Sequence, residues 1–200
     1  CLGPRVMDPQ IDQYLDAIEL DDNEQRLNLA THFTQQTPAT DFTQQVEQVS
    51  KGMFIEANTR VYAILFWFAL LGPVAAVLYR VVEQLLRSNL LDTTLVQTRQ
   101  VTRLFLSGMD WVPVRISLFT FMLSGSFEEG LQAYRRGTVV ATDLYEQNLE
   151  LLKEVGYRCI SGQTVENNTQ ALALVRKSRG LVLRSLVVWL LVVLFISLMA

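Results

Sequence analysis

Apolar residues gather in two long runs that contain no charged side chain. Residues 61–79 read VYAILFWFALLGPVAAVLY, and residues 185–200 read SLVVWLLVVLFISLMA. A helix rises about 1.5 Å per residue, so a hydrocarbon core of about 30 Å is crossed by about 20 apolar residues. Both runs approach this length, and we predict transmembrane helices over 61–82 and 181–200.

A third apolar segment, 104–127, is interrupted by Asp110, Pro113 and Arg115. Ionisable side chains at membrane depth are costly, so they usually pair, face the interior of a bundle or line a wet cavity. Two interpretations stay open: Asp110 and Arg115 are partners inside the membrane, or Asp110 marks the interfacial end of a shorter helix while Arg115 extends to the headgroups. Pro113 predicts a break in the helix in both cases. We predict a transmembrane or re-entrant helix here.

The polar segments have the periodicity of amphipathic helices. Ile11, Leu15 and Ile18 fall on one helical face, and Asp41 is a suitable N-cap for a helix that leads into the first apolar run. A further amphipathic pattern runs through 144–155. No segment alternates apolar and polar residues for long enough to predict a sheet. The fold class that follows is all-α, a multi-pass helical membrane protein with helical cytoplasmic segments.

Charge is distributed unevenly along the chain. Residues 1–50 hold nine acidic and two basic side chains, whereas the whole chain has a net charge of −3. Three spans put the helical segments 1–60 and 128–180 on one side of the membrane and a short polar loop or helix, 83–103, on the other. Lys and Arg are more numerous in the first two segments, so the positive-inside tendency places them in the cytoplasm. Arg80, at the opposite end of the first span, does not fit this arrangement.

Composition narrows the classes of partner. Half of the residues are hydrophobic and 18% are charged, which suits a membrane protein with parts in water. A net charge of −3 gives no basic excess for nucleic acid, so we exclude that class. The two cysteines, Cys1 and Cys159, have no CxxC spacing and predict neither a disulfide framework nor a zinc site.

Two patterns resemble sites without completing one. Residues 125–130 place two glycines at the separation of a phosphate loop, but Leu131 and Gln132 stand where Lys and Ser or Thr would hold phosphate and metal. Four carboxylates share one face of the first helix, where they form either an oxygen site for Mg²⁺ or a solvated surface. They are Asp8, Asp12, Asp16 and Glu19. We predict no catalytic residue, no metal site and no cofactor.

Four blocks of sequence together resemble the AmpE family. They are LFWFALLGPVAAVLYR at 65–80, MDWVPVR at 109–115, FMLSGSFEEGLQAYRRG at 121–137 and a Lys177/Arg179 cluster before the last apolar run. Members of that family are inner-membrane proteins of Gram-negative bacteria linked to regulation of the chromosomal β-lactamase. The resemblance covers most of residues 8–200. It implies an inner-membrane location and one or two further spans upstream of this chain.

The first two blocks also resemble the CobD/CbiB family of cobalamin-biosynthesis membrane proteins, which join an aminopropanol phosphate to a corrinoid side chain. That family has Glu-Asn-x-Ser-Asp-Gly shortly before the Leu-Phe-Trp block and Gly-Arg-Asp-Thr further upstream. Here the first stretch is reduced to Glu56-Ala57-Asn58-Thr59-Arg60, and the second does not occur. An amide-forming enzyme is therefore the alternative interpretation, and a transporter subunit is the third.

We therefore predict, from the resemblance to AmpE, a signalling or regulatory membrane protein that responds to β-lactams or cell-wall stress. Its expected partners are the lipid bilayer and proteins of the cell-wall or β-lactamase response. The cost of charge at membrane depth predicts a polar pocket whose occupancy changes the cytoplasmic helices. Five residues are candidates for lining it: Tyr79, Arg80, Asp110, Trp111 and Arg115.

Overall fold

The computed structural model describes residues 7–34, 38–87, 96–137, 143–160, 165 and 167–199. Its elements in chain order are α1 (Met7–Glu19), α2 (Asn23–Thr34), α3 (Phe42–Ala57), the π-helical turn η2 (Asn58–Tyr62), α4 (Ala63–Leu71), α5 (Pro73–Arg87), α6 (Val96–Ser124), α7 (Phe127–Gly137), α8 (Leu144–Cys159) and α9 (Asn168–Met199). No strand occurs in this part of the chain, which confirms the all-α prediction.

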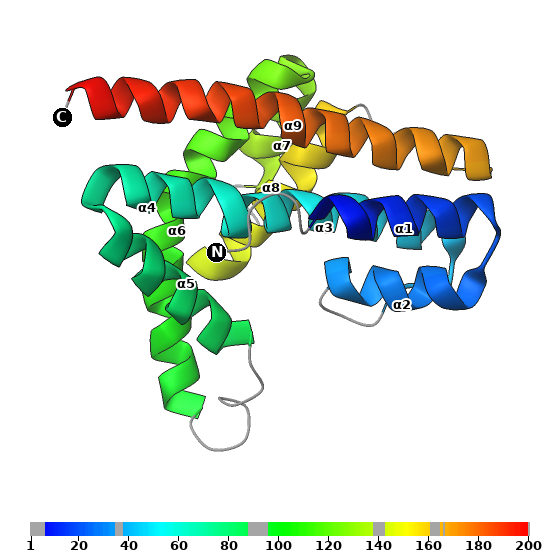
Figure 1. Ribbon diagram of the computed structural model, residues 1–200, viewed down its shortest axis with the longest axis horizontal. Coiled ribbons are helices and arrows are strands. Elements are labelled where there is room, and N and C mark those ends of the chain that lie inside the picture. Colours follow the sequence, from blue (N-terminus) through cyan, green and yellow to red (C-terminus); the bar gives the residue numbers. More distant parts are fainter. Residues whose placement is uncertain are drawn as a thin grey trace.

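α3, η2 and α4 follow one another without a break and form the central helix of the molecule (Figure 1). Asp41 caps the first turn as predicted, because its Oδ2 accepts a hydrogen bond from the backbone N–H of Gln44 at 3.0 Å. Helix α3 packs against α2, α8 and α9. Its buried Phe54 meets Phe121 of α6 at 5.3 Å between ring centroids. The core therefore lies around α3 and its continuation.

The apolar run 61–79 is not one helix. α4 ends at Leu71, Gly72 takes a φ of 82°, and Pro73 begins α5, which turns away and packs against α4 as a hairpin (Figure 1). Glycine reaches this left-handed conformation without strain. Proline is favoured in the first turn of a helix, where its missing N–H would have no helical partner. The single transmembrane helix predicted over 61–82 is wrong.

The hairpin returns the chain to the side from which it came. At the end of α5, Arg87 lies 2.7 Å from Glu56 of α3. Near the start of α6, Arg103 lies 2.6 Å from Glu146 of α8. The described part of segment 83–103 thus contacts the two segments that a three-span arrangement puts across the membrane from it. These contacts do not fit the three-span arrangement, which stays an unconfirmed prediction.

α6 is a single helix of 29 residues that includes Pro113. The break predicted at this proline does not occur, and the proline is buried in a helix that packs against both α8 and α9. Among the described residues, segment 104–127 is not part of a helix apolar enough to cross a bilayer. The transmembrane helix predicted there is not confirmed. α6 starts at Val96 and ends at Ser124, with one face in the core and an opposite face on which Leu104, Phe119 and other apolar side chains are exposed.

Two described helices are long and apolar enough to cross a bilayer, by length and composition. They are Phe42–Leu71 and Asn168–Phe195. The second contains most of the span predicted over 181–200, and its N-terminal half packs on α1 and α3. These helices support membrane association. A multi-pass topology and an inner-membrane location stay predictions.

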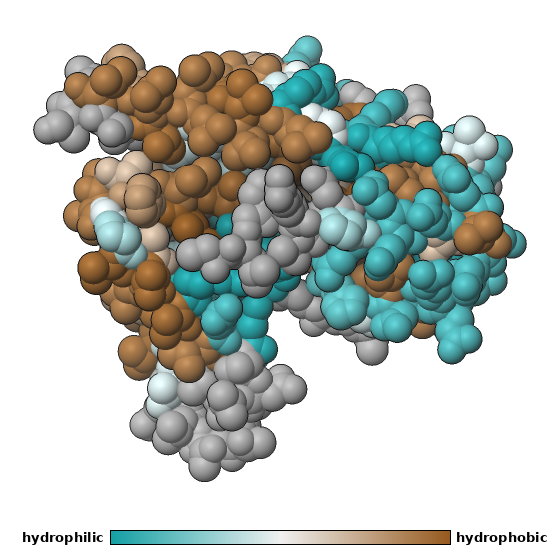
Figure 2. All heavy atoms as spheres, viewed as in Figure 1, coloured by the Kyte–Doolittle hydropathy of each residue, from teal (hydrophilic) through white to brown (hydrophobic). Residues whose placement is uncertain are grey.

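Hydrophobic and polar residues occupy different parts of the surface (Figure 2). Apolar side chains cover α4, the part of α5 next to it and the C-terminal end of α9, whereas polar side chains prevail over α1 and α2. An aromatic cluster joins α4 to α9 beneath the apolar surface. In it, the Trp189 ring lies 6.0 Å from Tyr62 and 6.2 Å from Phe66, between centroids. The apolar end of the molecule is therefore a packed structure, continuous with the core.

Gly125, between α6 and α7, and Gly130, within α7, allow close packing. A Cβ on Gly125 would lie 2.5 Å from the backbone oxygen of Cys159, and a Cβ on Gly130 would lie 2.6 Å from its Sγ. Only glycine lets this corner approach α8 so closely. Burial, together with the charge of Glu129, raises the pKa of the Cys159 thiol to about 12, so the thiol stays protonated at neutral pH.

The acidic face of α1 meets basic residues of α9. Asp12 lies 2.8 Å from Arg179, and Glu19 lies 3.0 Å from Arg176. The side chain of Asp8 lies outside the described residues. In the described part of the chain, no group of three His, Cys, Asp or Glu side chains could hold a metal ion. The face is an ion-pair surface between two helices.

Candidate functional site

Two of the five candidate residues meet in the core between α5 and α6. The Tyr79 hydroxyl donates to Asp110 Oδ1 at 2.7 Å, and 0% and 5% of the two residues are exposed. A buried carboxyl needs such a partner, because without one the loss of its hydration is not compensated. This contact therefore fixes α5 against α6.

Arg115 reaches α8. Its Nη1 donates to Asn148 Oδ1, and Asn148 Nδ2 donates to the Ser107 carbonyl at 3.2 Å. The guanidinium also lies over the Trp111 ring, 5.0 Å from its centroid, as a cation–π contact. Asp110 and Arg115 thus have different partners, and Asp110 is buried in the middle of a helix. Neither interpretation of this pair from the sequence describes the structure.

Arg80 belongs to a separate group of charges at the open end of the hairpin. Its Nη1 lies 2.7 Å from Glu83 Oε2, one turn along α5. Because the chain turns back at Gly72, Arg80 lies toward α3 instead of at the far end of a span, which removes its misfit with the charge pattern. The five candidates thus have different partners, and none of them lines the pocket described below.

Two buried glutamates form the centre of that group. Glu56 of α3 and Glu83 of α5 are each 2% exposed. Arg87 bridges them, with Nη1 at 2.7 Å from Glu56 Oε1 and Nε on Glu83 Oε1, and Arg60 contacts Glu56 from the next turn. Buried charges persist only when they are paired and hydrogen-bonded. We call Glu56, Arg60, Arg80, Glu83 and Arg87 the charge cluster, and it joins α3 directly to the end of the hairpin.

Arg87 stays charged within this cluster. Burial alone would lower the pKa of Arg87, but the charges and hydrogen bonds of Glu56 and Glu83 outweigh burial and raise that pKa above its ordinary value. Glu56, Glu83 and Arg87 were not among the residues predicted to line a pocket. A local signal was available, since Glu56 and Arg60, and likewise Glu83 and Arg87, stand four positions apart on either side of the apolar run.

Next to Glu56 the central helix widens for one turn. η2 is a π turn, and such turns are frequent at functional sites. The Ser117 hydroxyl of α6 donates to Asn58 Oδ1 at 2.9 Å and accepts from Trp189 Nε1 of α9 at 3.1 Å. This buried chain of hydrogen bonds ties the turn beside the charge cluster to two other helices.

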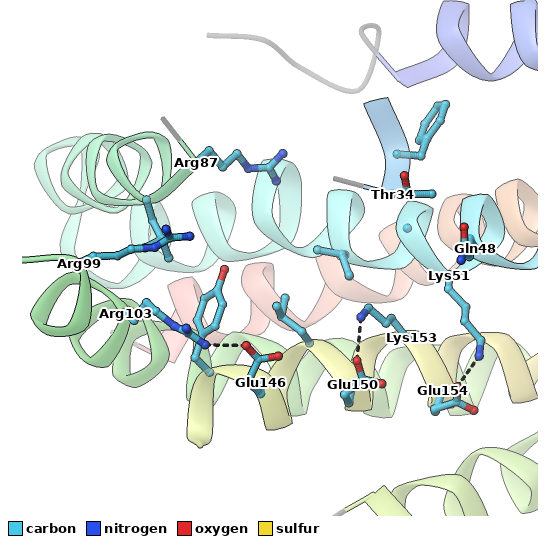
Figure 3. A pocket seen from close by; sticks show the side chains of 16 residues that line it. Thr34, Gln48, Lys51, Arg87, Arg99, Arg103, Glu146, Glu150, Lys153 and Glu154 are labelled. Atoms are coloured by element: carbon cyan, nitrogen blue, oxygen red, sulfur yellow. Dashed lines mark hydrogen bonds and ion pairs between the residues drawn. The ribbon is translucent and has the colours of Figure 1, made fainter. Parts of the chain in front are cut away.

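A pocket of about 820 Å³ opens beside the charge cluster, between α3, α6 and α8, with the ends of α2 and α5 at its edge (Figure 3). Ile55, Leu86 and Leu149 contribute an apolar wall. The charged residues of the lining comprise five basic and three acidic side chains, namely Lys51, Arg87, Arg99, Arg103, Lys153, Glu146, Glu150 and Glu154. Arg87 therefore belongs to both the charge cluster and the pocket.

Ion pairs connect the walls of the pocket. Lys51 contacts Glu154 and so links α3 to α8, while Arg103 lies 2.6 Å from Glu146 and links α6 to α8 (Figure 3). All four side chains are partly exposed. Pairs of this kind contribute little net free energy, so an incoming anionic group can replace a glutamate at small cost. The arrangement suits the binding of a polar ligand with negative groups.

Comparison with protein-family models, with curated proteins and with solved structures finds no match to this chain. The charge cluster, the pocket and the sequence blocks around them are therefore the observations that bear on function. The pocket lining, within the described part of the chain, includes no histidine or cysteine. Its chemistry is that of ion pairing beside an apolar wall.

Proposed function

We propose that this chain is a membrane-bound signalling protein of the AmpE type, which takes part in β-lactamase regulation by binding a small polar ligand in the pocket. The observation that carries the proposal is the position of the pocket, where the charged end of an apolar hairpin meets the polar helix α8. A ligand held there touches the apolar and the polar parts of the molecule at once. The link to β-lactamase comes from the resemblance in sequence.

The pocket favours a ligand that carries carboxylates or phosphates. Its volume of about 820 Å³ is suitable, since small-molecule sites commonly measure about 300–1,000 Å³. Basic side chains outnumber acidic ones in the lining, and arginine can bind a carboxylate through two parallel hydrogen bonds. A muropeptide, in which cell-wall sugars carry a peptide with free carboxylates, has this chemistry.

Ligand binding would act on the contact between α6 and α8. The ion pair between Arg103 and Glu146 joins these helices at the pocket, and a ligand carboxylate would compete with Glu146 for Arg103. Further along α6, Arg115 holds α8 through Asn148. A ligand shifts a conformational equilibrium only if it binds one arrangement more tightly than the other. We propose that the two arrangements differ in the ion pair between Glu146 and Arg103, which is broken in the arrangement that binds the ligand more tightly.

Thermal unfolding of the full chain in detergent tests this proposal. The probes are purified muropeptides, a corrinoid precursor and Mg-ATP. A ligand at about 100 times its Kd adds about 2.7 kcal/mol of stability, which raises the midpoint of a chain this size by roughly 5–10 °C. We expect muropeptides to do so in the wild-type protein and not in Arg103→Gln.

The matched control is Arg158→Gln, which removes an exposed arginine of α8 outside the pocket. It should keep the full shift with muropeptides. No shift with any probe, or an equal shift in Arg103→Gln and the wild-type protein, would contradict ligand binding in this pocket.

The π turn favours one second candidate, an amide-forming enzyme related to the CobD/CbiB family. Glu56 matches the first position of that family's motif and lies two residues before the first residue of η2. Against it, Glu56 is already paired with Arg60 and Arg87. A midpoint shift with the corrinoid precursor or Mg-ATP, and none with muropeptides, would favour the enzyme.

A further inference from the structure

α4 and α5 carry an exposed apolar surface down to the turn between them. Its large side chains are Phe68, Leu70, Leu71, Val74, Val77, Leu78 and Val81. Val74, next to the turn, is 78% exposed. The surface continues on the C-terminal end of α9 (Figure 2), through Val187, Leu191, Leu194 and Phe195. Apolar surface of this extent marks contact with a membrane or a partner.

Hydrogen bonds set α4 and α9 at the same level. Tyr62, one residue before α4, donates through its hydroxyl to the Val182 carbonyl at 2.9 Å and lies 2.7 Å from Ser185 Oγ. The last charged residue before the apolar part of α4 is Arg60, two positions before Tyr62. The last one before the apolar end of α9 is Arg184, one position before Ser185. Both apolar ends therefore begin in one plane.

From that plane the two ends reach different depths. α4 has nine residues, so it extends about 14 Å, close to half of a hydrocarbon core of about 30 Å. On the way back, 73–79 is uncharged and spans about 11 Å before Arg80. α9 continues from Ser185 to Met199, about 22 Å. The hairpin ends near the middle of a bilayer, whereas α9 passes it.

Charges at both ends of the hairpin prevent deeper insertion. Glu56 and Arg60 precede α4, and Arg80, Glu83 and Arg87 follow the apolar part of α5. They pair within each end, and Arg87 joins the two ends through Glu56. Transfer of such residues into hydrocarbon is strongly unfavourable. The charge cluster therefore holds both ends of the hairpin at the same face.

The turn itself suits a dry environment. Gly72 is the only residue between α4 and α5. Its N–H donates to the Phe68 carbonyl at 2.9 Å, and its carbonyl accepts from the Ala76 N–H at 3.4 Å. Pro73 has no N–H that could be left unpaired. Backbone polar groups in hydrocarbon must be satisfied within the protein, and this turn satisfies those of its one non-helical residue.

We infer that α4 and α5 form a re-entrant hairpin that inserts into one leaflet, with lipid acyl chains as its partner and with both ends on the side of α3 and α8. The longer apolar end of α9 passes the midplane beside it. This inference does not involve a ligand of the pocket. It therefore stands or fails separately from the proposed function.

Depth measurements on the full chain in lipid vesicles test the hairpin. One cysteine at a time is introduced at Val74 near the turn, at Val81 near the open end, or at the exposed polar positions Gln44 of α3 and Gln100 of α6. The chain carries Cys1→Ser and keeps the buried Cys159, and the same chain without an introduced cysteine gives the background of labelling. A bimane label on each cysteine is quenched by lipids brominated at deep or shallow acyl positions. We expect Val74→Cys to respond most to deep bromines, Val81→Cys to shallow ones, and the two polar positions to neither.

A membrane-impermeant maleimide then reports the side of the membrane. Gln44→Cys and Gln100→Cys should react from the same face of the vesicle, and Val74→Cys from neither face. Reaction of Val74→Cys from the face opposite to Gln100→Cys would overturn the hairpin. A label at position 74 that neither reacts nor is quenched would show that protein covers this surface, and would overturn the contact with lipid.

Discussion

Of the places where ion pairs join distant segments of this molecule, the hairpin and the contact between α1 and α9 differ most clearly in burial. At the hairpin, Glu56 and Arg87 lie 2.7 Å apart with 2% and 28% of their side chains exposed. Between α1 and α9, Asp12 and Arg179 lie 2.8 Å apart with 57% and 31% exposed. Equal distance does not mean equal energy, because water screens the exposed pair, while a buried carboxylate that loses its partner stays desolvated. The buried pair should therefore be structural and the exposed pair dispensable.

The pocket uses pairs of the exposed kind. Arg103 and Glu146 are 32% and 54% exposed, so their separation leaves neither charge in a dry environment. The charge cluster behind them cannot separate so easily. This contrast divides the site into a fixed part, which holds the hairpin, and an exchangeable part, which can respond to a ligand.

The largest expected effect comes from Glu56→Gln. Removing one member of a buried ion pair costs about 3–5 kcal/mol, because Arg60 and Arg87 lose a buried counter-charge. The free energy of unfolding, measured by denaturant titration in mixed micelles, reports the loss. Glu47→Gln is the control, since Glu47 pairs with Lys51 at a partly exposed site. A smaller loss for Glu56→Gln than for Glu47→Gln would break the comparison.

Next comes Tyr79→Phe, which removes the hydroxyl that donates to the buried Asp110. Leaving a buried acceptor unsatisfied costs about 1–3 kcal/mol. The same titration measures it. Asp110→Asn keeps an acceptor for Tyr79 and should lose less stability than Tyr79→Phe. If the two substitutions had the opposite order, the Tyr79 hydroxyl would not be satisfying a buried acceptor.

Gly72→Ala tests the turn of the hairpin. A Cβ at Gly72 meets nothing within 4 Å, so only its φ of 82° opposes a side chain, at about 1–2 kcal/mol. Gly108→Ala is a matched control, because Gly108 also has open space but lies inside helix α6. At position 108, alanine should increase the free energy of unfolding by about 0.5–1 kcal/mol. Equal effects at the two glycines would contradict a left-handed turn at Gly72.

The smallest effect is expected for Asp12→Asn. An exposed pair is worth about 0.2–1 kcal/mol, and salt screens it further. The loss measured at low ionic strength should shrink when salt is added, whereas the loss for Glu56→Gln should persist. A loss for Asp12→Asn that salt does not reduce would place this pair in the buried class.

The helices could be predicted from periodicity, but the turn at Gly72 could not. Gly-Pro is a turn signal, yet here it lies within 61–79, whose hydropathy is that of one span. Hydropathy is averaged over a window of residues and does not depend on the direction of the backbone, so a hairpin and a span of equal length have the same hydropathy. Arg80 was the visible conflict, because its position agrees with the charge pattern only if the chain turns back.

Only part of the candidate site could be predicted from the sequence. Asp110 could be selected, since a carboxyl in an apolar segment needs a partner, and Tyr79 is that partner. The partner of Arg115 could not be identified, because Asn148 lies 33 positions away on another helix. The pairing of Glu56 with Arg87 across 31 positions depends on the same information. Local spacing does not determine which helices pack together.

The most direct test of the difference between the two kinds of ion pair is a pair of double-mutant cycles. One combines Glu56→Gln with Arg87→Gln, and the other combines Asp12→Asn with Arg179→Gln, each read by unfolding free energy in mixed micelles. We predict a coupling energy of about 1.5–3 kcal/mol for Glu56 and Arg87, and less than about 0.5 kcal/mol for Asp12 and Arg179. Equal coupling in the two cycles would contradict the conclusion that the buried charge cluster holds the hairpin in place.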